Sequence, residues 1–71
     1  MATTSRYYVN KNAQANGDHE VHESGCTQGA DPENQVSLGY HGSCHGAVAQ
    51  AKQRYPTANG CAYCCEACNT G

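Results

Sequence analysis

The chain has 71 residues, a formal net charge of −2 at pH 7 and only four lysines and arginines. These cations do not cluster, and nucleic-acid binding depends on Lys and Arg that neutralise phosphates, so we expect no nucleic-acid partner. No apolar run is long enough to span a bilayer, and the N-terminus lacks the basic-then-apolar shape of a signal peptide. We therefore expect a soluble, cytoplasmic monomer with no membrane association, formed by a single domain over residues 1–71.

The composition provides little material for a hydrophobic core. The chain has no Phe, Trp or Ile, one Leu and four Val, which leaves the Tyr and Ala residues to fill most of the interior. Below roughly 70–80 residues a core alone seldom supplies more than about 3–5 kcal/mol. We therefore expect a metal ion or disulfide bonds to stabilise the fold.

A β-hairpin is predicted near the N-terminus. Residues 7–10 (YYVN) are aromatic and β-branched, and residues 19–23 (HEVHE) place one valine among polar residues, as short strands do. Between them, residues 16–18 (NGD) can adopt the positive φ that a hairpin turn needs. In the second strand, alternation directs His22 to the face opposite Val21.

A loop and a third short strand are predicted next. Residues 27–34 (TQGADPEN) contain an Asp-Pro pair and nothing apolar enough to anchor them, which is typical of a loop. Residues 36–38 (VSL) alternate apolar and polar side chains, and Gly39 is expected to end this strand.

A helix is predicted from Ser43, a good N-cap, to about Tyr55, which precedes a proline. The apolar stripe of this helix has spacings of i, i+4, i+7 and i+11 and consists of Cys44, Val48, Ala51 and Tyr55. Cys44 is therefore expected to be a buried small apolar residue rather than a ligand.

The C-terminal segment is predicted to be a turn followed by a knuckle. Asn59 and Gly60 form a turn that presents Cys61, and residues 61–68 have room for at most one helical turn. The predicted fold class is therefore α+β: a β-hairpin, with or without a third strand, packed on one helix and followed by a Cys-rich knuckle.

Four of the six cysteines lie in the segment CAYCCEAC, which contains two C-x-x-C units. An H-x-x-x-C pair stands upstream, and one imidazole with three thiolates suits tetrahedral zinc. The predicted zinc ligands are His22, Cys26, Cys61 and Cys64.

These motifs resemble those of two protein families. Strand-H-x-x-x-C, a loop, a Ser-capped helix and a final C-x-x-C are similar to small bacterial metal-binding modules of the Ada alkyltransferase N-terminal type, over residues 21–64. The segments GDHEVH, GC and NGCxxCCxxC, within residues 17–68, resemble an uncharacterised family of small bacterial Cys-rich proteins that carries no established activity. The first resemblance implies a metal site. Both patterns leave cysteines that a four-ligand site does not need.

These surplus cysteines keep alternatives open. Cys44, Cys65 and Cys68 can serve as alternative ligands or as disulfide partners. An even number of cysteines in a short chain also fits a disulfide scaffold, which would imply a secreted protein, and a mixture of metal and disulfide is the third alternative.

The remaining polar residues are interpreted as ordinary surface residues. His41 and His45 flank the helix start and are expected to be solvated, and His19 and Glu20 are expected to be exposed on the second strand.

The function that follows is a zinc-stabilised structural module that binds a protein partner. The main alternative is a thiol redox or metal-handling protein that uses the tail C-x-x-C units. A hydrolytic enzyme is disfavoured, because a chain of this size leaves little room for a substrate pocket. We therefore expect no enzymatic activity.

Overall fold

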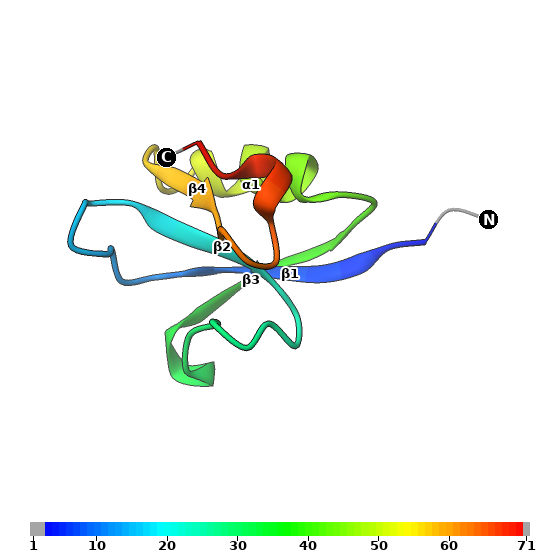
Figure 1. Cartoon of the computed structure of the whole chain (residues 1–71), viewed down its shortest axis with the longest axis horizontal. Coiled ribbons are helices and arrows are strands. Elements are labelled where there is room, and N and C mark those ends of the chain that lie inside the picture. Colours follow the sequence, from blue (N-terminus) through cyan, green and yellow to red (C-terminus); the bar gives the residue numbers. More distant parts are fainter. Residues whose placement is uncertain (1–2, 71) are drawn as a thin grey trace.

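The computed structural model describes residues 3–70 as a four-stranded mixed sheet with one helix packed on one face (Figure 1). In chain order the elements are β1 (Ser5–Asn10), β2 (His19–Glu23), the 3-10 helix η1 (Pro32–Asn34), β3 (Gln35–His41), α1 (Cys44–Lys52), β4 (Ala58–Gly60) and the 3-10 helix η2 (Glu66–Cys68). The strand order is β3-β1-β2-β4, with β1 antiparallel to both neighbours and β4 parallel to β2. The predicted α+β class is confirmed.

The N-terminal hairpin forms as predicted. Strand β2 has the predicted bounds, and β1 begins two residues earlier than residue 7. Gly17 has a φ of 90°, and the Asn16 side chain accepts a hydrogen bond from the Asp18 N–H at 2.9 Å, which closes the turn. The aromatic and β-branched residues of this hairpin therefore form the centre of the sheet.

Strand β3 is longer than the prediction, because Gly39 does not end it. Gly39 has a φ of 75° and forms a β-bulge: Tyr7 pairs with Gly39, whereas Tyr8 pairs with Ser37. The strand thereby skips Leu38 in the pairing and continues to His41.

Helix α1 begins after Ser43, as predicted, but ends at Lys52 instead of continuing to Tyr55. The N–H groups of Arg54 and Tyr55 both donate to the Ala51 carbonyl, which turns the chain away from the helix axis. Tyr55 stacks on His19 instead, with ring centroids 4.2 Å apart. The expectation that His19 is exposed is therefore wrong, since this ring is half-buried.

Strand β4 replaces the turn that was predicted at Asn59 and Gly60. These residues pair in parallel with Glu20 and Val21 of β2, and the Cys61 N–H donates to the Val21 carbonyl at 2.9 Å. The prediction failed because the composition of these three residues does not indicate a strand. The strand is defined by its pairing with β2, which lies about forty residues earlier in the chain.

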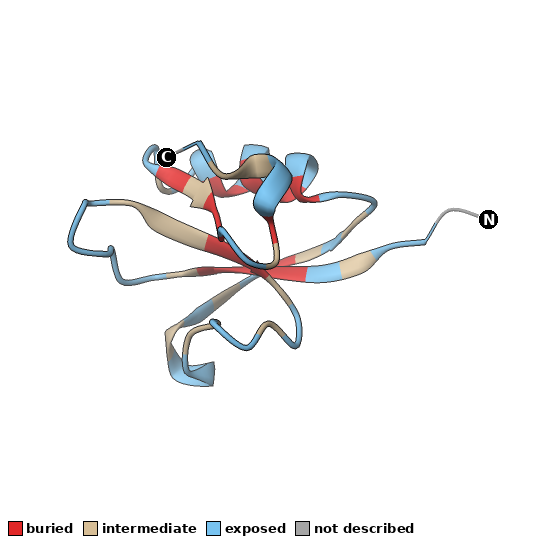
Figure 2. Ribbon diagram, viewed as in Figure 1, coloured by how far each residue is buried: buried red, intermediate tan, exposed pale blue. Residues whose placement is uncertain are grey.

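The core lies between the sheet and α1 (Figure 2). It combines residues of the central strands, one face of the helix and two tail cysteines: Tyr7, Val9, Val21, Leu38, Cys44, Ala47, Val48, Ala51, Ala58, Cys61 and Cys65. On the sheet's other side, Tyr8 packs under the loop that follows β2, and its hydroxyl leaves no room for a side chain at Gly29. No helix among residues 3–70 has the length and apolarity to cross a membrane.

Candidate metal centre

The structure brings together the four residues that the spacing predicts as ligands. One ligand atom from each of His22, Cys26, Cys61 and Cys64 lies within 4.8 Å of the others. Two of these residues come from β2 and the turn after it, and two come from the end of β4 and the knuckle. The cluster therefore joins segments that are about forty residues apart in the sequence.

The pairing of β2 with β4 explains this convergence. Val21 pairs with Gly60, so Cys61 directly follows the last paired residue and lies beside His22. The Cys65 N–H donates to the Cys61 carbonyl at 2.9 Å, which closes a turn and returns Cys64 to the same place. After β2 the chain turns at Gly25, which has a φ of 88°, and the Cys26 N–H donates to the Glu23 carbonyl. This turn places Cys26 beside the other three ligands.

The spacing of the ligand atoms fits tetrahedral coordination. The sulfurs of Cys26 and Cys61 are 4.0 Å apart, and Nδ1 of His22 is 3.7 Å from the Cys64 sulfur. Zinc bound to sulfur at about 2.3 Å places two tetrahedral sulfur ligands roughly 3.8 Å apart. The arrangement is therefore much wider than a disulfide and close to the edge of a zinc tetrahedron.

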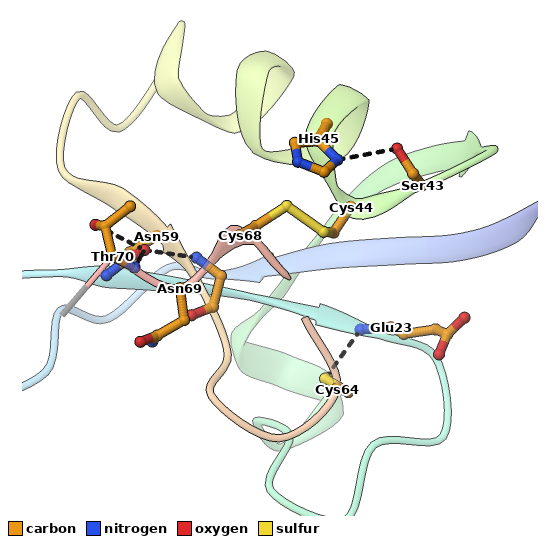
Figure 3. Close-up of a disulfide and its surroundings, with 10 residues drawn as sticks. Glu23, Ser43, Cys44, His45, Asn59, Cys64, Cys68, Asn69 and Thr70 are labelled. Carbon is orange, nitrogen blue, oxygen red and sulfur yellow. Dashed lines mark hydrogen bonds between the residues drawn. A yellow bond between two sulfur atoms is a disulfide. The ribbon is translucent and has the colours of Figure 1, made fainter. Parts of the chain in front are cut away.

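Backbone N–H groups point at two of the sulfurs. The Glu23 N–H donates to the Cys64 sulfur and the Tyr63 N–H to the Cys61 sulfur, both at 3.4 Å. In Figure 3 the Glu23 side chain points away from Cys64, so only the main chain of Glu23 faces the cluster. Such hydrogen bonds favour the thiolate, which is the form that binds a metal.

The imidazole of His22 has its two nitrogens in different surroundings. Nδ1 faces Cys64, whereas Nε2 lies 3.5 Å from a carboxylate oxygen of Glu20. A carboxylate at the second nitrogen is the usual partner of a metal-binding histidine, because it holds the proton there and leaves the first nitrogen free to bind. Glu20 was expected to be a solvated surface residue, and that expectation is wrong. Its position two residues before His22 on the same strand face is the signal that could have identified it.

Burial sets the protonation of the cluster before a metal binds. Desolvation lowers the pKa of His22, with the Glu20 carboxylate opposing this shift, so the imidazole is neutral and able to bind a metal. Desolvation and the thiol of Cys26 raise the pKa of Cys64, because a lone thiolate is poorly solvated there. A cation in the cluster would offset this cost by pairing with the thiolate.

The cluster is largely enclosed by protein. His22 and Cys61 are each 1% exposed, and Cys26 and Cys64 are half-buried. Four protein ligands occupy all positions of a tetrahedral ion and leave none for water or substrate, which is the pattern of structural zinc sites.

A disulfide lies on the other side of the knuckle (Figure 3). Cys44, at the start of α1, is bonded to Cys68 of η2 across 24 residues, with a Cα–Cα separation of 6.3 Å. Cys44 is buried on the apolar helix stripe, as expected, but it is not a free apolar thiol. Among the described residues, the structure thus combines one disulfide with a cluster of possible metal ligands.

Cys65 takes part in neither group. It is a free thiol, 2% exposed, and burial raises its pKa, which makes it unreactive. The redox alternative uses Cys65 and Cys68 as a C-x-x-C pair, but the structure pairs Cys68 with Cys44 instead.

The two histidines at the helix start differ. His41 is half-buried, with Nε2 lying 2.7 Å from the Leu38 carbonyl oxygen, so the expectation that it is solvated is wrong. His45 is exposed, as expected, but one of its nitrogens lies within 4.8 Å of the sulfurs of Cys44 and Cys68. The sequence places His45 next to Cys44, which is a signal for a pair of ligands. It does not reveal that Cys68 of η2 lies beside them.

Gly60 lies where the two sulfur groups approach each other. A Cβ atom there would be 2.7 Å from the Cys65 carbonyl oxygen and 2.7 Å from the Cβ of Cys68. Because such contacts are shorter than real Cβ atoms show, only glycine allows η2 to pack directly on β4.

In comparisons with known proteins, no family model, no curated protein and no solved structure matches this chain. The two resemblances drawn from its motifs therefore stay predictions. A function for this protein is inferred from the geometry of the site alone.

Proposed function

We propose that the protein is a small zinc-binding structural module that contacts a protein partner and has no catalytic activity. The ion is held by His22, Cys26, Cys61 and Cys64. It ties the β2 turn to the C-terminal knuckle and so supplies stability that the small core lacks. Structural zinc contributes about 10–16 kcal/mol in small peptides, which exceeds what a core of this size provides.

The observation that carries this proposal is the convergence of four ligand atoms within 4.8 Å. It is supported by two N–H groups that donate to the sulfurs and by the Glu20 carboxylate beside the second nitrogen of His22. These features favour the thiolate and the imidazole tautomer that bind a metal.

Native and denatured mass spectrometry of the purified protein test this proposal. We expect one zinc ion under native conditions, the loss of two hydrogens for the disulfide after denaturation, and four thiols that alkylate once zinc is removed. A chelator should unfold the protein. A protein that retains no metal, or one whose six cysteines are all paired, would contradict the proposal.

The proposed partner surface includes the knuckle. Tyr63 stands between Cys61 and Cys64 and is 75% exposed, although tyrosine normally buries most of its ring. Exposed tyrosines are enriched at protein interfaces. Tyr63→Ser should leave zinc content and the unfolding midpoint unchanged and weaken the capture of any partner recovered with the wild type. Equal capture by both proteins would exclude this surface.

We place the protein in the cytoplasm. The site needs three reduced thiols, and a reducing compartment keeps thiols in that state. The same environment would favour opening of the Cys44–Cys68 disulfide, so this bond is expected to exist in two redox states. Trapping of thiols in intact cells with an alkylating reagent should show both states of this pair. A fully oxidised set of six cysteines would place the protein in an oxidising compartment.

A further inference from the structure

A second group of metal ligands lies outside the proposed zinc site. One ligand atom from each of Cys44, His45 and Cys68 lies within 4.8 Å of the others. Cys44 and His45 are the first two residues of α1, and Cys68 is the last residue of η2. We propose that reduction of the Cys44–Cys68 disulfide opens this group as a site for one Cu(I) ion, bound by the two thiolates and the imidazole.

The sulfurs stay opposed after reduction, because other bonds hold the tail in place. The Asn69 side chain donates to the Gly60 carbonyl at 2.9 Å. The Thr70 N–H donates to the Asn59 side chain at 3.1 Å (Figure 3). The Cys68 N–H donates to the Cys65 carbonyl at 2.9 Å. None of these bonds involves the disulfide. The site is therefore organised by the same contacts in both redox states.

The chemistry balances with a thiol reductant and Cu(I). Two reductant thiols supply two electrons and two protons to the S–S bond, which yields the thiols of Cys44 and Cys68 and the disulfide of the reductant. Cu(I) then displaces the two thiol protons to solvent and keeps its oxidation state. The neutral imidazole of His45 binds without releasing a proton. In the oxidised protein neither sulfur is a thiolate, so no such site exists.

The donor set favours Cu(I) over zinc. Thiolates are soft ligands that suit Cu(I), and this ion is stable in trigonal coordination, whereas structural zinc takes four protein ligands. Two of the three donors, His45 and Cys68, line a hollow of about 320 Å³. Lys52 lines this hollow, and its ammonium group complements the single negative charge that two thiolates and one Cu(I) ion leave.

This openness distinguishes the second site from the first. The sulfurs of the two groups are similarly covered, since Cys44 is buried and Cys68 half-buried, but His45 is exposed whereas His22 is fully buried. An open thiolate site permits an incoming thiolate to approach the ion. The second site is therefore suited to reversible uptake of copper, a role that does not rest on zinc in the first cluster.

An anaerobic titration tests the inference. Zinc-loaded protein is reduced with a dithiol, freed of the reductant by gel filtration, and titrated with Cu(I) in the presence of bathocuproine disulfonate as a coloured competitor. A zinc indicator follows release of zinc. We expect the reduced wild type to take up one equivalent of Cu(I) before zinc release begins. The oxidised wild type and the Cys44→Ser/Cys68→Ser variant should release zinc from the first addition.

Substitutions at histidine define the third ligand. His45→Gln should weaken Cu(I) binding by at least about tenfold, and His19→Gln, which removes an imidazole elsewhere, should have no effect. Equal copper uptake by the reduced wild type and the double serine variant would overturn the site. Unchanged affinity in His45→Gln would overturn the imidazole ligand, and uptake of a second zinc ion in preference to Cu(I) would overturn the choice of ion. The difference in copper uptake is measurable even where the first cluster holds no zinc, so failure of the two proposals can be told apart.

Discussion

The two sulfur groups of this protein lie on opposite sides of one short knuckle and differ in the number of ligands, the state of the sulfurs and the exposure of the histidine. The His22, Cys26, Cys61 and Cys64 group is enclosed, has hydrogen-bond donors at its sulfurs and offers four ligands. The Cys44–Cys68 pair bridges the helix to η2 and has an exposed histidine beside it.

Under the two proposals above, one Cys-rich segment contributes ligands to two different sites. Four ligands spaced at tetrahedral distances favour a permanent ion, because no position is left for exchange. A disulfide with one half-buried cysteine and an exposed histidine beside it is the group we expect to change its redox state. Four variants test this distinction, beginning with the largest expected effect.

Two buried tail cysteines allow a matched test of the first group. Cys61 and Cys65 are both fully buried, but only Cys61 belongs to the candidate metal cluster. Cys61→Ala should abolish zinc binding and unfold the protein, a loss on the order of 10 kcal/mol. Cys65→Ala should retain zinc and lose only about 1 kcal/mol through the small cavity it leaves. Zinc content and circular dichroism measure both, and equal effects would show that the cluster holds no metal.

Removal of the disulfide should have a smaller effect. The disulfide joins residues 24 positions apart and so restricts the unfolded chain. The Cys44→Ala/Cys68→Ala variant removes this restriction, so we expect the free energy of unfolding to fall by about 3 kcal/mol. Urea unfolding of the zinc-loaded variant measures it, and reduced wild type should show a similar loss. Zinc content should not change. Release of zinc on loss of the disulfide would show that the two groups are not independent.

Gly60→Ala tests the place where the two groups meet. The new methyl group would collide with the Cys65 carbonyl and the Cβ of Cys68, so η2 must shift, at a cost of about 2 kcal/mol. We expect slower formation of the disulfide as well. Gly42→Ala is the matched control, because a Cβ there meets nothing within 4 Å. Thermal unfolding and alkylation after reoxidation measure the two effects, and equal behaviour of both variants would rule out close packing at Gly60.

The smallest effect is expected at the carboxylate beside His22. Glu20→Gln removes the charge near Nε2 and should weaken zinc binding about tenfold, since it leaves the ligands in place but no longer favours the required tautomer. Glu23→Gln is the control, because only the main chain of Glu23 contacts the cluster. Competition with a zinc indicator gives both affinities. A larger loss in Glu23→Gln would contradict the role of Glu20.

Local patterns in the sequence were enough to predict the N-terminal hairpin, the start of the helix and the four residues of the candidate metal cluster. Turn chemistry at Gly17, the Ser43 cap and the apolar helix stripe act over a few residues, so their physical causes are visible in the sequence. The H-x-x-x-C and C-x-x-C spacings likewise bring each pair of ligands close without help from the rest of the fold.

Tertiary structure alone decided the remaining features. Strand β4 exists because β2 offers it hydrogen-bond partners, and the bulge at Gly39 depends on its pairing with β1. The partner of Cys44 could not be chosen from the sequence, because η2 is placed against α1 by contacts at Gly60 and Asn59. The position of His45 beside the sulfur of Cys68 follows from the same packing. Interactions within a few residues are encoded locally, whereas pairing between distant segments depends on which surfaces the folded chain buries together.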